Sequence, residues 1–391
     1  MAEPDATHAI VRFLSELVRI PSRAGIDPYE PVLDAVAGWL SAHKLPHEFV
    51  HDARGAPIAI WGRIGASRGR CYLLNATVDT APFGDESRWT HAPLSAAQAD
   101  GWLYGRGSGD SKAAVAIFCH ALETLLPRSG GWSGSLAYVF DAGEHTGEFT
   151  GLRRFMEVHG PSLQPAGAMI GYPGNDRIAI GGRGFLRARV RVHGQAAHTG
   201  SSDNKGASAV WRAAKLVDAL HATALPAANP AGFPLPPRAS VTAVEGGSGF
   251  SVVPDLCTMN VDVRLTPDFD DAAARAHVAR LVEEHDRAAP DLPRTEIEWI
   301  AGWPAYQLAA DAPIVRALRD AAREVLGREP ATDVVGPSSV GNLLHQLGVP
   351  ATNGFGVTCE NIHANDERIA LDTIAPTLEI YCRALRSLLA G

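Results

Sequence analysis

The chain has 391 residues, of which 46% are hydrophobic and 20% charged, and its formal net charge is −8. This length exceeds what one hydrophobic core usually serves, so we expect a globular protein of two domains. No basic run and no apolar run of membrane-spanning length occurs in the sequence, so we expect neither nucleic acid nor a membrane among its partners.

Alternating helices and strands are predicted for the first part of the chain. The first twenty residues, MAEPDATHAIVRFLSELVRI, lack the basic start and apolar block of a secretory signal and indicate an amphipathic helix. Five cysteines without paired spacing are typical of reduced thiols, so we expect a cytoplasmic protein.

The elements expected in this first part of the chain are helices over 6–18, 29–43, 113–126 and 151–159, and strands over 48–63, 70–78, 136–140 and 166–171.

The pattern changes after residue 181, where FLRARVRV (185–192) alternates arginine with apolar residues, as in a strand with one solvated face. A βαββαβ order is predicted: strand 185–192, helix 207–221, strands 240–245 and 257–265, helix 270–288 and strand 295–300. The α/β pattern then resumes with a helix over 312–326, a polar loop over 336–342, a strand over 350–355 and a closing helix over 371–389. We therefore predict an α/β domain, 1–181 and 303–391, that carries an inserted α+β domain, 182–302.

The stretch from Leu136 to Gly151, LAYVFDAGEHTGEFTG, contains the most informative motif. An apolar strand ends in a small-residue break, and Glu144 and His145 follow at once. In α/β proteins, groups just past the carboxyl end of a strand project into the crevice where ligands bind. Glu144 is thus a candidate general base and His145 a candidate metal ligand. A glutamate at the positive end of a helix dipole would give the same pattern without any function.

Other candidate ligands also lie at the ends of predicted elements. Asp79 follows the strand over 70–78, Asp110 precedes the helix over 113–126, and His363 follows the last predicted strand. Taken alone, Asp110 is better explained as a helix cap, and His198, in AAHTGSSD, as a surface or core histidine without function. Together with the Glu-His pair, these residues indicate a hydrolase that uses a bound metal ion as a Lewis acid.

The series of motifs resembles the metallo-aminoacylase and carboxypeptidase family, which includes acetylornithine deacetylase, succinyl-diaminopimelate desuccinylase and glutamate carboxypeptidase. The motifs that carry the resemblance are VDTAP (78–82), Trp89 with Pro93-Leu94, GWLYGRGSGDSK (101–112), Gly194 with His198, VVPD (252–255), VDVR (261–264), and His363 with Asp366-Glu367. They span nearly the whole chain. The resemblance implies a zinc-peptidase-like, mixed-sheet catalytic domain with an inserted lid domain, and a homodimer formed through that lid.

The sequence departs from the family at two metal-ligand positions. The family's two-metal centre uses a histidine two residues before Asp79, where this chain has Thr77. Its acidic ligand just before a proline falls on Tyr172. Asp110 matches the aspartate that bridges the two ions. One of the two sites would therefore keep only Asp110.

The other metal site would keep three ligands. Asp110 and His363 match the family, and His145 stands where the family has a second glutamate. Two imidazoles and one carboxylate suit zinc first, and also manganese or iron. We therefore expect one divalent metal per subunit. Glu144, the first residue of the pair, matches the family's general base.

The resemblance implies roles for further residues. Asp79 would orient a ligand or the base. His198 would reach the active site of the partner subunit and steady the oxyanion, and Arg264 would bind a substrate carboxylate. The other residues expected to contact the substrate are Thr77, Tyr172, Ser338, Ser339 and Asn342.

The favoured interpretation is a metallohydrolase that cleaves an amide or related C–N bond of a small carboxylate-bearing substrate. A second interpretation is hydrolytic deamination, or other C–N hydrolysis of an unusual substrate such as an aromatic amine, with Thr77 and Tyr172 binding it. A third is a non-catalytic dimeric binding protein. A purely structural zinc is disfavoured, because such sites usually have four protein ligands and the sequence offers three.

Overall fold

The computed structural model describes residues 4–66, 68–225 and 232–390. The chain divides into two compact units. The first unit comprises Met1–Gly181, Leu308–Asp333 and Ser339–Gly391, and the second comprises Gly182–Gln307 and Val334–Ser338. The second unit therefore runs a few residues past the boundary at 302 that the sequence indicates. None of the helices in the described ranges is long and apolar enough to cross a membrane.

The elements alternate along the chain in the way that the sequence indicates. Up to the start of the second unit they are α1 (Pro4–Arg19), α2 (Glu30–Ala42), β1 (Glu48–His51), β2 (Pro57–Gly65), β3 (Cys71–Thr77), β4 (Gln98–Ala99), β5 (Trp102–Tyr104), α3 (Ala113–Leu125), β6 (Ser135–Asp141), α4 (Thr150–Leu163), β7 (Gly167–Ile170) and β8 (Arg177–Gly182). The following elements are β9 (Gly184–His193), β10 (Ala197–His198), α5 (Ala209–Ala222), β11 (Arg238–Gly246), β12 (Val252–Val253), β13 (Leu256–Leu265), α6 (Asp271–Arg287), β14 (Glu296–Trp303) and β15 (Tyr306–Gln307). The chain closes with α7 (Pro313–Leu326), β16 (Ala331–Val335), α8 (Val340–Gln346), β17 (Cys359–Glu360), β18 (Arg368–Ala370) and α9 (Ile374–Leu389).

A mixed sheet forms the centre of the first unit, in the order β1-β2-β6-β3-β7. β3 runs parallel to both β6 and β7, whereas β2 is antiparallel to β6. Every residue of β3 is buried, which explains its apolar sequence, because a central parallel strand is covered on both faces. The carboxyl ends of β6, β3 and β7 therefore meet at one edge of the sheet.

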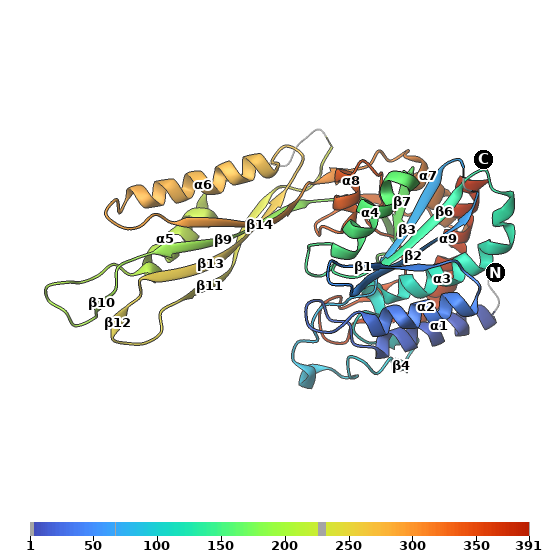
Figure 1. Ribbon diagram of the computed structural model, residues 1–391, viewed down its shortest axis with the longest axis horizontal. Helices are drawn as coiled ribbons and strands as arrows, with labels where there is room; N and C mark the ends of the chain where they lie inside the picture. Colours follow the sequence, from blue (N-terminus) through green and yellow to red (C-terminus); the bar gives the residue numbers. More distant parts are fainter. Residues whose placement is uncertain (1–3, 67, 226–231, 391) are drawn as a thin grey trace. The chain divides into compact units, whose positions relative to one another are not determined.

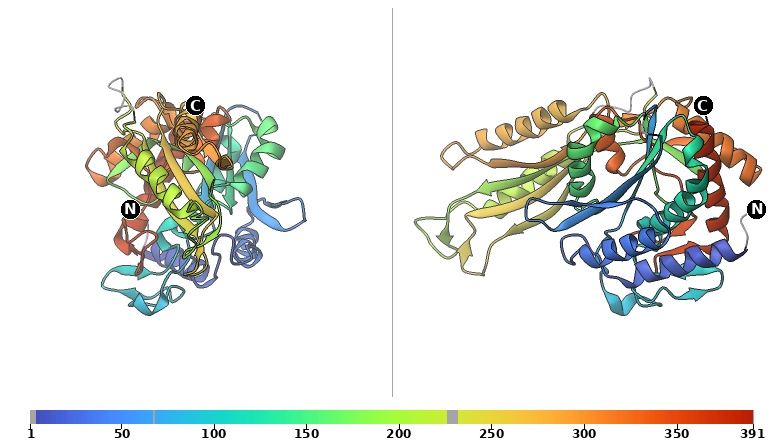
Figure 2. Two further views of the ribbon diagram at one scale, coloured as in Figure 1. Left: turned by 90° about the vertical axis from the view of Figure 1, so that its left-hand side faces the viewer. Right: turned by 45° about the vertical axis from the view of Figure 1, so that its right-hand side comes forward.

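Helices cover both faces of this sheet (Figures 1 and 2). Trp61 on β2 packs against Phe155 of α4, with ring centroids 5.4 Å apart. Its neighbour Gly62 points to the opposite face and makes room for Tyr138, whose hydroxyl donates to the carbonyl of Pro46, just after α2. The sheet thus lies between α4 on one side and α2 with α3 on the other.

One expected strand is replaced by irregular chain. Residues 350–355 make only isolated bridges, Ala168 to Ala351 and Ala179 to Gly354. Gly354 has a φ of 156°, which a regular strand does not contain. The prediction of a strand there was wrong, although the segment still runs beside β7 and β8.

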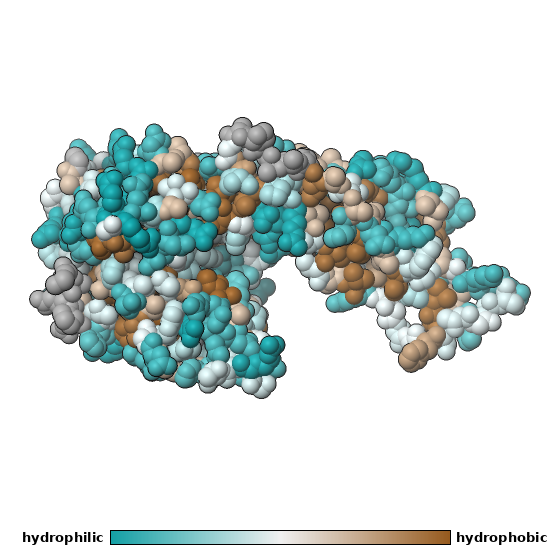
Figure 3. All heavy atoms as spheres, turned by 180° about the vertical axis from the view of Figure 1, so that it is seen from behind, coloured by the Kyte–Doolittle hydropathy of each residue, from teal (hydrophilic) through white to brown (hydrophobic). Residues whose placement is uncertain are grey.

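The second unit is an antiparallel sheet in the order β11-β13-β9-β14, with α5 and α6 packed on its apolar face. The other face is polar: Arg187 pairs with Asp262, and Arg191 with Glu298. Its elements follow the βαββαβ order, with the short strands β10 and β12 paired in addition. Apolar surface is also visible on this unit (Figure 3). The exposed apolar side chains here include Val210, Trp211, Val244, Phe250, Val252 and Leu256.

Candidate metal centre and catalytic site

The parallel strands of the first unit deliver five predicted site residues to the same edge of the sheet. Thr77 is the last residue of β3, and Asp79 follows two positions later. Glu144 and His145 follow β6, and Tyr172 follows β7. This is the edge at which open α/β sheets bind ligands.

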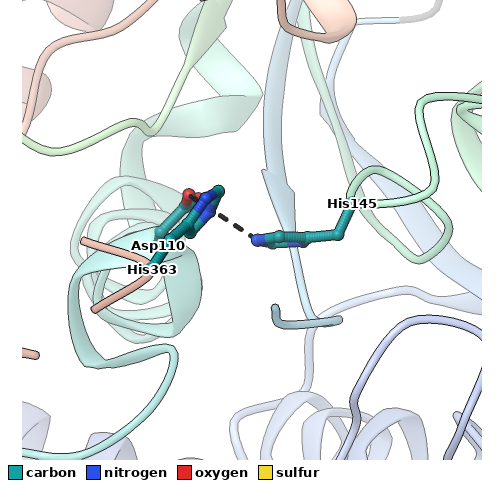
Figure 4. A group of neighbouring side chains, drawn as sticks. All are labelled: Asp110, His145 and His363. Carbon is teal, nitrogen blue, oxygen red and sulfur yellow. Dashed lines mark hydrogen bonds and ion pairs between the residues drawn. The ribbon is translucent and has the colours of Figure 1, made fainter. Parts of the chain in front are cut away.

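Three side chains converge at this edge with donor atoms suitable for a metal ion (Figure 4). One ligand atom each from Asp110, His145 and His363 lies within 4.8 Å of the others. Nε2 of His363 lies 2.9 Å from Oδ2 of Asp110, and Nε2 of His145 lies 3.6 Å from that oxygen. The Asp110 and His145 side chains are buried, whereas His363 is 55% exposed. The structure thus brings together the three residues that the sequence predicts as ligands.

The donor atoms fit a divalent cation. Oδ1 of Asp110 and Nε2 of His145 are buried, and neither has a hydrogen-bond partner among the described residues. Leaving such atoms unsatisfied is costly, and a cation between them would satisfy both. Burial raises the pKa of Asp110, but the two neighbouring imidazoles outweigh it and hold the pKa below its usual range. Two nitrogens and a carboxylate form a ligand set that suits zinc and leaves positions open.

Asp79 orients His145. Its carboxylate accepts from the backbone N–H groups of Glu144 at 3.2 Å and His145 at 3.1 Å. It also lies 3.3 Å from Nδ1 of His145. With the ring proton on Nδ1, the lone pair of Nε2 faces Asp110. Outer carboxylates commonly set the tautomer of metal-binding histidines in this way.

Thr77 faces this carboxylate and not the ligand set. Its side chain is buried, and its hydroxyl contacts the Asp79 carboxylate and lies 3.0 Å from the carbonyl oxygen of Asp141. Its backbone N–H donates to Oγ of Ser111 at 3.2 Å. The hydroxyl and the backbone N–H of Thr77 therefore both have partners within the protein.

Glu144 is a buried carboxylate beside the ligand set. Its Oε1 accepts a hydrogen bond of 2.6 Å from the hydroxyl of Tyr172. Its Oε2 lies 3.3 Å from Nδ1 of His145. Burial raises the pKa of Glu144 to about 7, against the opposing effect of His145 and with the help of the Asp110 charge. A carboxylate with this pKa is suited to accept and return a proton near neutral pH.

Glu367 is a buried residue whose role the sequence did not reveal. It forms an ion pair with Arg106, Nη1 to Oε2 at 2.7 Å, and both side chains are almost fully buried. Its other oxygen accepts from the backbone N–H groups of Gly109 at 3.0 Å and Asp110 at 3.2 Å. Glu367 therefore fixes the turn that presents Asp110. The available signal was a second acidic residue four positions after His363.

The loop that carries His363 is also anchored by Asp366. This carboxylate accepts from the backbone N–H of Thr90 at 2.8 Å and from its hydroxyl at 2.8 Å. The backbone of His363 itself has a positive φ of 61°. Asp366 and Glu367 thus fasten the loop to two separate segments of the first unit.

The remaining predicted residues have local partners. Ser339 and Asn342 form the capping box of α8, and both are buried. Ser338, in the second unit, donates to the carbonyl of Arg183 at 2.6 Å. Arg264 pairs with Asp262 at 2.8 Å in the second unit. His198, on β10, is exposed and accepts from the N–H of Gly200 at 3.0 Å.

Comparisons with known proteins agree with this architecture. The sequence model of peptidase family M20/M25/M40 matches residues 73–387. Succinyl-diaminopimelate desuccinylase 2 of Ruegeria sp. (strain TM1040) is 27% identical over 401 residues, 99% of this chain and 97% of that protein. Succinyl-diaminopimelate desuccinylase of Marinobacter nauticus is 27% identical over 338 residues, 85% of this chain and 86% of that protein.

Solved structures share the fold. An M20 family metallo-carboxypeptidase from Sulfolobus solfataricus superposes with a TM-score of 0.78 at 17% identity, covering 98% of this chain and 99% of that one. A tripeptidase from Staphylococcus aureus gives a TM-score of 0.78 at 19% identity with the same coverage. A protein from Bacillus subtilis, described as a dinuclear metal-binding peptidase of the M20 family, gives 0.72 at 16% identity, covering 99% of both chains.

Proposed function

Because the chain belongs to peptidase family M20/M25/M40 and is a hydrolase of amide or peptide bonds, we propose that it works with one metal ion. In this proposal, Glu144 is the general base and the substrate is a small carboxylate-bearing molecule with an amide or related C–N bond. The observation that carries the proposal is the convergence of Asp110, His145 and His363 beside the buried carboxylate of Glu144.

A divalent cation held by these three ligands would polarise the scissile carbonyl and lower the pKa of a water molecule to roughly 7 in favourable zinc sites. Glu144 accepts a proton from the attacking water, whose oxygen forms the new bond to the carbonyl carbon. Glu144 then donates that proton to the nitrogen as the C–N bond breaks, so the products are a carboxylic acid and an amine. Asp79 keeps His145 oriented throughout.

The proposal of a single ion rests on Thr77 and Tyr172. Neither side chain is a carboxylate or an imidazole, and their hydroxyls contact Asp79 and Glu144. These two residues therefore offer no charged donors for a second cation beside Asp110. Zinc is the ion we favour, with manganese or iron as alternatives that the same ligands accept.

The substrate class follows from the relatives that cover nearly the whole chain. Two of them are named desuccinylases, so we propose an N-acyl amino acid or a dipeptide as the substrate. Arg264 is our candidate for binding a substrate carboxylate, because a guanidinium binds carboxylates through two parallel hydrogen bonds. Ser338, Ser339 and Asn342 stay candidates for substrate contact, whereas the hydroxyls of Thr77 and Tyr172 are engaged by Asp79 and Glu144.

We also propose a homodimer formed through the second unit, in which His198 acts on the active site of the partner subunit. Its support is that His198 is exposed and that apolar side chains, including Trp211 and Phe250, lie at the surface of this unit. The protein is expected to act on small molecules in the cytoplasm, without nucleic acid or membrane partners.

Elemental analysis of protein purified without chelator tests the proposed function. We expect one metal ion per chain, lost in His145→Ala and retained in a control, His51→Ala, whose side chain is exposed. The loaded protein should hydrolyse at least one member of a panel of N-succinyl amino acids, N-acetyl amino acids and dipeptides. Two well-occupied ions per chain would overturn the single-metal proposal, and a metal-loaded protein inactive on the whole panel would overturn the proposed reaction.

A further inference from the structure

We propose that Tyr172 is the positioning residue of Glu144, holding its carboxylate in place through the hydroxyl hydrogen bond. The hydrogen bond itself is part of the geometry of the first unit. Its role in catalysis rests on the proposed function. Tyr172 itself is not a catalytic residue in this proposal, because it acts through Glu144.

The backbone of Glu144 is held by hydrogen bonds, so the position of its carboxylate depends on the torsion angles of the side chain. The backbone N–H donates to Asp79 at 3.2 Å, and the carbonyl oxygen accepts from the N–H of Gly147 at 2.8 Å. Beyond the backbone, a glutamate side chain still has three rotatable bonds, which an unrestrained carboxylate samples freely. Some contact must therefore select one orientation.

The Tyr172 hydroxyl provides the stronger of the carboxylate contacts seen in the described residues. Its oxygen lies 2.6 Å from Oε1 of Glu144, a distance typical of hydrogen bonds to an ionised acceptor. The second contact, 3.3 Å to Nδ1 of His145, is longer. That nitrogen also lies 3.3 Å from Asp79, and it carries at most one proton to share between them.

Tyr172 is held in turn by two glycines from a distant part of the chain. A Cβ at Gly354 would lie 2.5 Å from Cβ of Tyr172, and a Cβ at Gly356 would lie 2.4 Å from its carbonyl oxygen. The backbone N–H of Tyr172 donates to the carbonyl of Ile170 at 3.0 Å. The backbone and Cβ of Tyr172 are thus packed tightly on segment 354–356 at the end of β7, which fixes the point from which the ring extends toward Glu144.

A double-mutant cycle tests the inference on the best substrate of the panel. Tyr172→Phe should lower kcat about 10-fold to 100-fold, the worth of a hydrogen bond to a charged group. KM and metal content should not change. In the Glu144→Gln background the same substitution should have almost no further effect. Tyr138→Phe is the matched control, because it removes a tyrosine hydroxyl whose partner is the Pro46 carbonyl, on the face of the sheet toward α2. This variant should leave kcat unchanged.

Proton NMR supplies a readout that needs no turnover. The Tyr172 hydroxyl proton should resonate downfield of the backbone amides, as protons in short hydrogen bonds to carboxylates do. That signal should disappear in both Tyr172→Phe and Glu144→Ala, and persist in Tyr138→Phe. If the wild-type protein hydrolyses no member of the substrate panel, the proposed function fails. The NMR signal would still show whether the Tyr172 hydroxyl bonds to Glu144.

Several results would overturn the inference. A normal kcat in Tyr172→Phe would show that Tyr172 does not act through this carboxylate. The same conclusion would follow if Tyr172→Phe lowered kcat equally in the wild-type and Glu144→Gln backgrounds. Loss of the metal from Tyr172→Phe would make it part of the metal site. A downfield signal that is absent from the wild type, or that survives Glu144→Ala, would show that the hydrogen bond does not form.

Discussion

The carboxylate of Glu144 lies 3.3 Å from Nδ1 of His145, whereas the other ring nitrogen, Nε2, lies near Asp110. Glu144→Gln keeps the size of the side chain and an oxygen that accepts the Tyr172 bond, but removes the ability to take up a proton. We predict that the variant retains the fold and one metal ion while turnover falls by about 10²–10⁴. Elemental analysis and steady-state kinetics check both parts.

The same loop contains its own control for this prediction. Glu148 is exposed and four residues away, so Glu148→Gln should behave like the wild type. If Glu144→Gln loses the metal, Glu144 is a ligand and the division between base and ligands is wrong. If Glu144→Gln turns over normally, the proton is taken by another group, and Asp79 is the next candidate.

Glu367 gives a second prediction for a single residue. Glu367→Gln would leave the guanidinium of Arg106 buried without its countercharge, which costs about 3–5 kcal/mol when one partner of a buried pair is removed. The turn that presents Asp110 would also loosen. We therefore expect lower thermal stability and weaker metal binding, measured by calorimetry and zinc titration.

Glu360 makes a suitable comparison for Glu367. It pairs with Arg368 at 2.6 Å, but 47% of its side chain is exposed. Exposed pairs contribute about 0–1 kcal/mol, so Glu360→Gln should change neither property noticeably. Equal effects of the two substitutions would contradict the assignment of Glu367 as the anchor of Asp110.

For single residues, the sequence indicated which side chains belong to the candidate site better than it indicated which contacts they make. Asp110, His145 and His363 were predicted as ligands from their residue types and from the resemblance, and the structure brings their donor atoms together. The hydrogen bond from Tyr172 to Glu144 was not, because it joins residues 28 positions apart and depends on glycines still farther along the chain. Likewise, Glu367 gains its meaning from burial beside Arg106, which no local pattern encodes.

Among the elements, β2 and α2 offer opposite predictions for the same substitution. A Cβ at Gly62 in β2 would lie 1.9 Å from the carbonyl oxygen of Pro46 and 2.4 Å from the Tyr138 hydroxyl. Gly62→Ala should therefore lower the free energy of unfolding by about 1–3 kcal/mol. Gly38, inside α2, is exposed and has nothing within 4 Å of a Cβ. Gly38→Ala should raise stability by about 0.5–1 kcal/mol.

Chemical denaturation of the two variants measures these changes directly. A stabilising effect of Gly62→Ala would mean that the contact between β2 and Tyr138 is looser than the structure has it. No gain from Gly38→Ala would mean that α2 is limited by packing and not by backbone entropy.

The elements themselves were largely predictable, and the exceptions have physical reasons. The run RCYLLNATV predicted β3, because a strand that is buried on both faces needs apolar side chains along most of its length. Residues 350–355, PATNGF, combine the apolar Ala351 and Phe355 with Asn353 and Gly354, and the chain leaves extended geometry at Gly354. Helix α4 continues to Leu163, beyond the expected end at 159, although Pro161 lies within it.

For the whole molecule, the prediction concerns sharing of active sites between subunits. If the second unit forms the proposed dimer, His198→Ala and Glu144→Ala subunits each lack a different contribution. Mixing them should restore part of the activity, because some hybrid sites then contain both an intact His198 and an intact Glu144. Subunit exchange is verified with differently tagged chains, and the assay is compared with each variant alone.

Two outcomes of the mixing experiment decide the matter. Recovery above the sum of the separate activities supports sites completed by the partner subunit. No recovery, with exchange demonstrated, would place His198 outside the catalytic machinery. Sequence alone indicated this arrangement only through the resemblance, since the composition of the short strand β10 does not identify what it contacts.

The loop from Asn361 to Glu367 has a consequence for how fast an ion is exchanged. Asn361, His363 and Asp366 all have left-handed backbone angles, and Asp366 and Glu367 fasten the loop at its end. A ligand on such a loop gives up little conformational entropy when it coordinates. Release of the ion instead requires the loop to open locally, so the lifetime of the bound metal should follow the opening equilibrium of a few residues. Loosening the Asp366 anchor would then shorten that lifetime without altering any ligand.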